Sequence, residues 1–399
     1  MSKTKIVDKV LFLCYNMCIL RKEKIIMTET YSSLHNHNDY SNASLGFPDS
    51  VNKYDELIQS AYDLGLYGIA ITNHECISDH IKDLKYYKDM QKDRPFKLIL
   101  GNEIYLLSES EDIGNREGTA DTPFYHFLLN ALNEKGHEQL RQLSDRAWKR
   151  AYTYYGLMRR PTYYSDLEDI IRPNQGNVVA SSACLGGVIP KMITSGNTET
   201  AINAIKYFDD LFGHGNFYLE IQPCTPKNLD QLKVNEFLAK VGKELGIKVI
   251  VTTDSHYLTK KDSFNHKVFL NSKEGGGERE VDDFYETTYL MSAKELREYL
   301  RLSFDDDYID YLFDNTNEIM DRAVDYDFEH TPMIPQLPLD KIPPFEIEHR
   351  YKDYYEKYPE FGYYAHTENI QDKYFFYKIE QSLYELIEIN CKDLEKYIA

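Results

Sequence analysis

The stretch LHNHNDYS, at Leu34–Ser41, has two histidines one residue apart, with an apolar residue before them and polar residues after them. This pattern is typical of the end of a short strand, where residues i and i+2 point to the same face. His35 and His37 can therefore direct two imidazole nitrogens at one point, which is the geometry that a metal ion requires from a strand. Paired histidines also occur on polar surface strands, so a metal site needs further ligands from elsewhere in the chain.

The composition of the 399-residue chain predicts one large α/β domain, with or without an appendage. Hydrophobic residues make up 42% and aromatic residues 14%, which is enough for a real core. The net charge of −19 argues against a protein that coats nucleic acid through bulk electrostatics, although a bound metal can supply positive charge where a phosphate lies. The six cysteines form no C-x-x-C pair, which indicates free thiols in a reducing compartment.

Residues 1–27 are interpreted as a disordered extension or as the result of a misplaced start, because Met27 lies directly before the organised region. The apolar run Val10–Leu20 lies between basic residues, which also allows a signal-peptide interpretation. It is too short to span a bilayer, however, and no small-residue cleavage pattern follows it. No other segment is a transmembrane candidate, and we therefore expect a cytoplasmic protein without a membrane partner.

Apolar strands alternate with helices along the chain, which predicts a parallel sheet or barrel. Polar residues follow most of these strands at the carboxyl end, the face on which α/β barrels build active sites. Taken singly, His74 also fits a helix cap or a core histidine, and Glu103 fits the partner of a surface lysine. Cys184 and His126 also fit an ordinary core. Together the strand-end residues predict a metal site, and they are His35, His37, His74, Glu103, Cys184, Asp254 and His256.

The sequence contains no competing catalytic motif of the phosphate-loop, dinucleotide-binding or G-x-S-x-G type. Gly275–Gly277 lies in an acidic loop and is interpreted as a flexible linker. The best candidates for a DNA-binding track lie in the helical middle segment, although such a run also fits an ordinary solvated surface. These candidates are Arg141, Arg146, Lys149, Arg150, Arg159 and Arg160.

The chain contains the longer motifs LHNHNDYSN, GIAITNHE, GNEIYLL, YHFLLNALNEKGHEQL, VVASSACLGGVIPK, FYLEIQP and VTTDSHYLTKKD. Together they resemble the motifs of the PHP (polymerase and histidinol phosphatase) superfamily, in the form found at the amino terminus of bacterial and phage DNA polymerase III alpha subunits. The resemblance covers roughly residues 31–300 and implies a distorted (β/α)7 barrel, the PHP fold, with a mostly helical C-terminal extension. It implies a phosphoesterase domain at 28–300 and a helical connector at 301–399 that leads toward an absent polymerase palm.

The resemblance also implies up to three divalent metal ions at the mouth of the barrel. Histidines, carboxylates and a single thiolate suit Zn²⁺, Mn²⁺ or Fe²⁺ and do not suit Ca²⁺. The ligand positions carried over from the family are His35, His37, Asp49, His74, Glu103, His126, Cys184, Asp254 and His256.

The implied activity is hydrolysis of a phosphoester by metal-activated water, with catalytic roles for His126, His256 and Asp254. The implied substrate is the 3′ end of DNA, which makes the chain a proofreading-type 3′→5′ exonuclease in DNA replication. Its implied partners are separately encoded palm and fingers parts of a polymerase, or other replisome subunits. Two alternatives stay open: a non-catalytic, metal-stabilised docking module, and a small-molecule phosphatase of the histidinol-phosphate kind.

The chain departs from the family pattern at two places. The usual T-D-H of the second motif is Thr72-Asn73-His74, so an amide replaces the acidic residue beside a ligand, and turnover depends on whether the amide is tolerated. Asp49 lies farther from the paired histidines than in many relatives, because Asn42–Pro48 is longer. Glu220, within FYLEIQP, is interpreted as a residue that supports the site without binding metal.

Overall fold

The computed structural model describes residues 29–46, 48–112, 124–154, 157–272, 285–328, 331 and 337–388. The chain divides into two compact units, Met1–Phe328 and Glu329–Ala399, and each is described by itself. The extension expected at residues 1–27 and the linker expected at Gly275–Gly277 lie outside the described residues.

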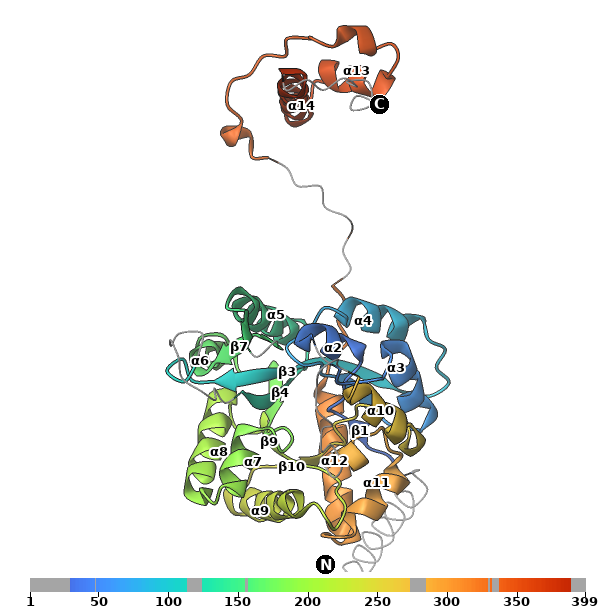
Figure 1. Ribbon diagram of the computed structural model, residues 1–399, viewed down its shortest axis with the longest axis vertical. Coiled ribbons are helices and arrows are strands. Elements are labelled where there is room, and N and C mark those ends of the chain that lie inside the picture. The colour runs from blue at the N-terminus through green and yellow to red at the C-terminus, as the bar shows by residue number, and fades with distance from the viewer. Residues whose placement is uncertain are drawn as a thin grey trace, which may run out of the picture. The chain divides into compact units, whose positions relative to one another are not determined.

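The first unit is built on a curved mixed sheet whose strands follow one another around a barrel (Figure 1). Neighbouring strands are parallel, except that β4 runs antiparallel to both of its neighbours. A parallel bridge between Asn36 and Ser255 joins the chain beyond the first strand to the chain beyond the last. The predicted distorted (β/α)7 barrel is therefore confirmed. In spatial order the strands are β1 (Ser32–Ser33), β2 (Gly68–Ile71), β3 (Lys97–Leu107), β4 (Tyr125–Ala131), β8 (Val178–Ser181), β9 (Phe217–Ile221) and β10 (Val249–Val251).

The strands are apolar throughout because both of their faces are buried. Alternate residues belong to two separate clusters. Ile69 and Ile71 of β2 pack in the large cluster that includes the surrounding helices, whereas Ala70 belongs to a small second cluster. The same alternation in β8, β9 and β10 puts Val179, Tyr218 and Ile250 in the second cluster, which therefore fills the inside of the barrel.

Helices surround the sheet and leave the carboxyl ends of the strands to connecting loops (Figure 1). A short hairpin of β5 (Tyr152–Tyr154) and β6 (Leu157–Arg159) leads into β7 (Pro161–Tyr163), which pairs with the far end of β3. The helices are α2 (Asp39–Leu45), α3 (Tyr54–Asp63), α4 (His80–Asp89), α5 (Glu134–Lys149), α6 (Tyr164–Ile170), α7 (Val188–Thr194), α8 (Thr198–Phe212), α9 (Leu229–Leu245), α10 (Ser263–Leu270), α11 (Ala293–Leu300) and α12 (Asp306–Arg322).

The first unit extends to Phe328, which differs from the domain boundary expected at residue 300. The difference arises because α12, expected in the connector, packs on the barrel. Its Asn315 side chain donates a hydrogen bond to the Val249 carbonyl at 2.7 Å, and its Thr316 hydroxyl accepts one from the Ser32 N–H at 3.0 Å. These contacts satisfy main-chain hydrogen-bonding groups of β10 and β1, the two end strands of the sheet. The helix is therefore part of the barrel.

The second unit is mostly helical, as expected for the C-terminal extension. Its core brings the ring of Phe361 to 4.9 Å from that of Phe376 and 5.7 Å from that of Tyr355. The elements are η5 (Leu339–Lys341), η6 (Lys352–Tyr354), α13 (Pro359–His366) and α14 (Ile370–Glu388). Among the helices of the described residues in either unit, none is long and apolar enough to cross a membrane.

Candidate metal centre

All nine residues expected as metal ligands lie in one cluster, at the end of the barrel where the parallel strands have their carboxyl ends and the antiparallel β4 has its amino end. The loop after β1 carries His35 and His37, and the loop after β10 carries Asp254 and His256. The Asn36–Ser255 bridge brings these two loops together. The other positions are Asp49 before α3, His74 after β2, Glu103 in β3, His126 in β4 and Cys184 after β8.

Glu103 lies at the middle of the cluster and is fully buried. Its Oε1 is 2.9 Å from His126 Nδ1 and 3.4 Å from His35 Nε2. Its Oε2 is 2.9 Å from His74 Nδ1 and 3.2 Å from His37 Nε2. One carboxylate therefore faces four histidines from three segments of the chain, and it would lie within reach of more than one metal ion held in the cluster.

The ligand atoms form three overlapping groups, each compact enough to hold a metal ion. His37 belongs to the first two groups, and His74 belongs to the first and the third. The groups are His37, Asp49, His74 and His256; His35, His37 and Asp254; and His74, Glu103 and His126.

Two expected ligands need separate description. Asp49 reaches the cluster despite its longer connection, because its Oδ2 lies 3.5 Å from His256 Nε2 and 3.6 Å from His74 Nε2. Cys184 lies outside the three groups, but its Sγ is 3.4 Å from His126 Nδ1, at the edge of the third. Both side chains are therefore within reach of the cluster.

Four polar atoms in the cluster are buried and have no hydrogen-bond partner: Asp49 Oδ2, His74 Nδ1, Glu103 Oε2 and Asp254 Oδ1. Leaving such atoms unpaired costs free energy, on the order of 1–3 kcal/mol each. All four point at atoms that are themselves ligand candidates, so a cation among them would satisfy several at once. The residues present therefore fit a multinuclear metal site, and the mixture of imidazole, carboxylate and thiol fits Zn²⁺, Mn²⁺ or Fe²⁺.

The cluster is strongly charged in the metal-free state. Burial lowers the pKa of His35 and His256, but the neighbouring carboxylates raise it by more. The net result is a pKa of about 9 for His256 and a pKa well above the usual range for His35. Burial likewise opposes charge on Asp49 and Glu103, yet the surrounding histidines lower the pKa of both carboxyl groups well below the usual range. Protons on the histidines thus take the place of metal charge.

Glu220 supports the cluster from inside the barrel. Its Oε1 is 2.8 Å from His35 Nδ1 and accepts a hydrogen bond from the Thr252 hydroxyl at 2.6 Å, while its Oε2 accepts one from the Ser181 hydroxyl. With Nδ1 donating to the carboxylate, His35 presents Nε2 to the metal groups. This position agrees with the supporting role that the sequence indicated for Glu220.

The backbone around the cluster adopts unusual conformations. Asp254 has a φ of 48°, Glu75 follows His74 with a φ of 49°, and Ala183 precedes Cys184 with a φ of 58°. Positive φ angles are costly for residues with a Cβ and are typical of functional sites, where the surrounding structure holds them. Three of the ligand segments are therefore held in place by strained turns.

Gly186 is needed for the position of His126. A Cβ at this glycine would lie 2.9 Å from the Cγ and 3.0 Å from the Cδ2 of the His126 ring. We expect Gly186→Ala to push the ring away from Glu103 and to reduce metal affinity by roughly 10-fold or more, as displacement of a ligand does. Circular dichroism should stay unchanged while bound metal, measured by elemental analysis, falls. A control variant at the neighbouring Leu185, Leu185→Ala, should keep its metal.

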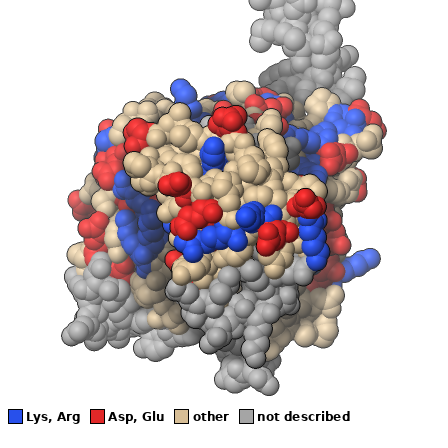
Figure 2. Space-filling view, turned by 90° about the horizontal axis from the view of Figure 1, so that it is seen from above, with Lys and Arg blue, Asp and Glu red and all other residues tan. Residues whose placement is uncertain are grey.

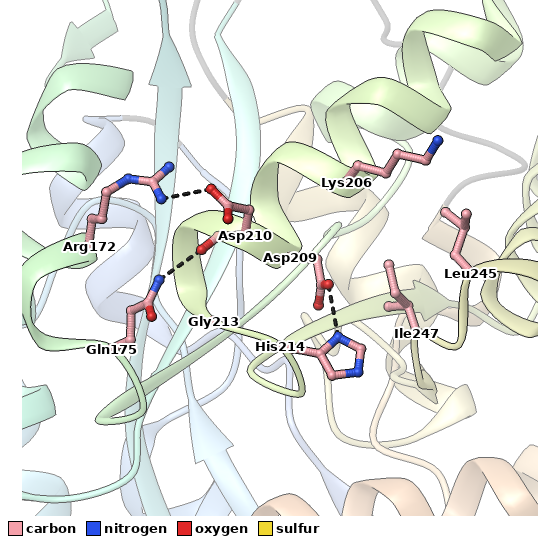
Figure 3. Close-up of a pocket in the computed structure, with 9 residues that line it drawn as sticks. All are labelled: Arg172, Gln175, Lys206, Asp209, Asp210, Gly213, His214, Leu245 and Ile247. Carbon is pink, nitrogen blue, oxygen red and sulfur yellow. Dashed lines mark hydrogen bonds and ion pairs between the residues drawn. The ribbon is translucent and has the colours of Figure 1, made fainter.

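A separate surface pocket lies at the opposite ends of the strands, before β8, β9 and β10 (Figure 3). Arg172 contacts Asp210 at 2.7 Å and His214 contacts Asp209 at 3.0 Å, so these two basic side chains are already paired with acidic ones. The pocket is distinct from the metal cluster, and we assign it no ligand. Its lining is Arg172, Gln175, Lys206, Asp209, Asp210, Gly213, His214, Leu245 and Ile247.

The sequence did not single out the polar residues that surround His37. Ser41 and Asn38 follow it directly, and Asp79 lies just before α4. They are fully buried and hydrogen bonded to one another through Asn73. A buried polar residue in a loop leaves no periodic signal, and in the structure Asn38 is the N-cap of α2.

Comparison with known proteins agrees with this arrangement. The model of the PHP domain matches residues 33–224. The chain is 34% identical over 374 residues to "Probable DNA polymerase YorL" of Bacillus subtilis and to a DNA-directed DNA polymerase of Bacillus phage SPbeta, covering 89% of this chain and 28% of each relative. It is 30% identical over 317 residues to the DNA polymerase III subunit alpha of Borreliella burgdorferi, covering 77% of this chain and 25% of that protein.

Among solved structures, a putative metal-dependent phosphoesterase from Bifidobacterium adolescentis aligns with 70% of this chain at 13% identity and a TM-score of 0.27. The chain spans 28% of the length of the first two polymerase relatives. Residues 33–224 match the PHP domain family, and over most of its length the chain is similar to DNA polymerases that include a DNA polymerase III alpha subunit.

Proposed function

We propose that the chain is a metal-dependent phosphoesterase that removes nucleotides from the 3′ end of DNA, as a 3′→5′ exonuclease in DNA replication. The observation that carries this proposal is the set of three overlapping ligand groups, with Glu103 between them and four unpaired buried atoms directed into them. The relatives are named as DNA polymerases, which supports DNA as the substrate class.

The proposed ligands are the nine residues of the cluster. Divalent ions held there lower the pKa of a bound water and stabilise negative charge on a phosphoester. His126 is suited to a second role because its side chain is 25% exposed, whereas those of His37, His74 and His256 are almost completely buried. It is the histidine that a substrate reaches first, and we propose that it hydrogen bonds the leaving group. Asp254 and His256 are proposed to orient the attacking water from the opposite side of the cluster.

Arg159 is the proposed contact for the substrate phosphate. Its guanidinium lies 4.4 Å from the ring centre of Phe124 and 5.7 Å from that of Tyr105, and the Tyr105 ring is 5.1 Å from that of His126. Arg159 has no carboxylate partner among the described residues, and its Nε is buried without a hydrogen bond.

The other basic residues of the middle segment are already engaged. Arg141 pairs with Glu138, Lys149 with Asp145, and Arg146 and Arg150 with Asp166, while Arg160 stacks on Trp148. Figure 2 shows the same mixture of charges, with Lys and Arg interleaved with Asp and Glu across the visible face. Among the six basic residues of the middle segment, the proposed DNA contact is therefore the single guanidinium of Arg159.

Arg159→Ala is expected to raise the KM for a phosphoester substrate roughly 10–100-fold, the effect of losing one charge-assisted hydrogen bond. Bound metal should stay unchanged, because Arg159 belongs to none of the ligand groups. Steady-state kinetics with elemental analysis would check both. The matched control is Lys149→Ala, which removes a charge from the same segment but one already paired with Asp145 at 2.6 Å. Equal effects of the two substitutions would contradict the assignment.

The proposed function is tested by loading the protein with Mn²⁺ or Zn²⁺ and offering end-labelled single-stranded DNA and p-nitrophenyl phosphate esters. We expect nucleotides to be released stepwise from the 3′ end. Absence of cleavage, with His35→Ala indistinguishable from wild type, would reject the enzymatic proposal. Cleavage of small phosphate monoesters alone would favour the small-molecule phosphatase.

The non-catalytic docking module stays the second candidate because the second unit exposes large aromatic side chains. Tyr363 is 63% and Phe375 62% exposed, and aromatic residues of this kind commonly anchor protein interfaces. On this proposal the partner is a separately encoded polymerase part or another replisome subunit. A protein that binds metal, is stabilised by it and hydrolyses no phosphoester would favour this candidate.

A further inference from the structure

Asn73 is fully buried and uses every hydrogen-bonding position of its amide. Its Oδ1 accepts from the Asn38 main-chain N–H at 2.8 Å and from the Ser41 hydroxyl at 3.0 Å. Its Nδ2 donates to Asn38 Oδ1 at 2.8 Å and to Asp79 Oδ2 at 2.5 Å. Because a main-chain N–H can only donate, this network also fixes which end of the amide is oxygen.

The network continues to His37 through Ser41. The single hydroxyl proton of Ser41 is given to Asn73, so the hydroxyl can only accept from His37 Nδ1, which lies 3.0 Å away. The Ser41 oxygen also accepts the His74 main-chain N–H at 3.1 Å. The Nδ1 of His37 therefore carries a proton, and Nε2, which lies 3.1 Å from Asp254 Oδ1, is the ring nitrogen left facing the metal groups.

Asp79 supplies the negative end of this chain of hydrogen bonds. Besides Asn73 it accepts from Asn38 Nδ2 at 2.7 Å, and a second carboxyl group, Asp83, is fully buried on the same helix. A carboxylate in place of Asn73 would meet Asp79 at the distance where the amide now donates. Asp79 thus occupies the position where a negative charge is hydrogen bonded by the amides of Asn73 and Asn38.

We propose that Asn73 and Asp79 act together as a positioning unit for His37, in which Asp79 provides the carboxylate and Asn73 transmits its hydrogen bond through Ser41 to the imidazole. The unit replaces an acidic residue at position 73 and keeps His37 in the tautomer that binds metal. The inference rests on the metal site of the proposed function, and it does not depend on which phosphoester, if any, is cleaved.

The test is an exchange of the two side chains. Asn73→Asp alone puts two carboxylates in contact, and we expect a 10–100-fold loss of Zn²⁺ affinity by titration calorimetry, the range found when partners of a metal-binding histidine are removed. Asp79→Asn alone removes the negative charge but keeps an acceptor oxygen, and should lower the affinity less. The double variant Asn73→Asp/Asp79→Asn restores one carboxylate and one amide, and should return the affinity to within about 3-fold of wild type.

The tautomer of His37 gives a readout that is independent of activity. Selective ¹⁵N-histidine labelling of the metal-free protein should show a protonated Nδ1 for His37, identified by the loss of its signals in His37→Gln. Ser41→Ala should change this pattern without bringing charges together, which keeps the test decisive if Asn73→Asp does not fold. A double variant that binds metal no better than Asn73→Asp, or an unchanged His37 tautomer in Ser41→Ala, would overturn the proposal.

The two failures are distinguishable. Restored Zn²⁺ affinity and the expected tautomer, together with no cleavage of DNA, would reject the exonuclease and leave the positioning unit intact. If the wild-type protein cleaves DNA and the Asn73→Asp variant binds Zn²⁺ as tightly as wild type, the positioning unit alone is rejected.

Discussion

A Glu103→Gln variant is expected to lose most of its bound metal and at least ~100-fold of its phosphoesterase activity, because Glu103 is the one carboxylate that faces histidines of all three ligand groups. The amide has nearly the same shape but is neutral, and its NH₂ end would point at one of the imidazoles. Elemental analysis of the purified variant and its kcat/KM on a phosphoester would measure the two losses.

Glu75→Gln is the matched control for this prediction. Glu75 is also a buried glutamate close to Glu103, but it belongs to none of the ligand groups, and it accepts a hydrogen bond from the Tyr105 N–H, which a glutamine oxygen can also accept. Burial raises the pKa of Glu75 well above its usual range, so the substitution removes less charge than it would at an exposed glutamate. We expect this variant to keep its metal and activity. A Glu103→Gln protein that retains full metal content would contradict the bridging position.

The sequence predicted the cluster because strand ends are readable from local patterns. Short apolar runs that stop at a polar residue, such as β2 before Asn73 and His74, identify the carboxyl ends of parallel strands, and these ends must meet in a barrel. His126 was harder, because it is followed by Phe127 and Leu128 and resembles a core residue. It reaches the site through the antiparallel register of β4, which pairs it with Tyr105, and register is a tertiary property.

Features that depend on partners distant in the chain could not be predicted. The six basic residues of the middle segment are equivalent in sequence, and only their neighbours single out Arg159. The boundary at Phe328 required the contacts of α12 with the barrel edges. The pairing of Asn73 with Asp79 spans six residues and a turn, and neither residue carries a signal of the other.

Removal of the metal is expected to destabilise the protein more at pH 8.5 than at pH 6. In the metal-free state the carboxylates overcome burial and raise the pKa of His256 to about 9, while that of an unfolded histidine is about 6.5. A raised folded-state pKa stabilises the fold fully below pH 6.5, and this stabilisation disappears as the pH rises toward 9. The loss from His256 between pH 6 and 8.5 is on the order of 2–3 kcal/mol.

The pKa shifts of His35 and Cys184 also make the metal-free protein less stable as the pH rises. The pKa of His35 is raised well above its usual range, so its protonated form also contributes less as the pH rises. Burial and nearby carboxylates raise the pKa of the Cys184 thiol, so an unfolded chain ionises this residue first at high pH. A bound metal takes the place of these protons, because it needs neutral imidazoles and a thiolate and supplies the positive charge itself, so the loaded protein does not lose this stabilisation as the pH rises.

Scanning calorimetry of the chelator-treated and the Zn²⁺-loaded protein at both pH values would measure this difference. We expect the melting temperature of the metal-free protein to fall by roughly 5–10 °C from pH 6 to pH 8.5, and that of the loaded protein to change less. His256→Gln should reduce the dependence of the metal-free protein. If the difference in melting temperature between the loaded and the metal-free protein narrows as the pH rises, the histidines are neutral without metal. The carboxylates of the cluster would then be balanced by some other charge.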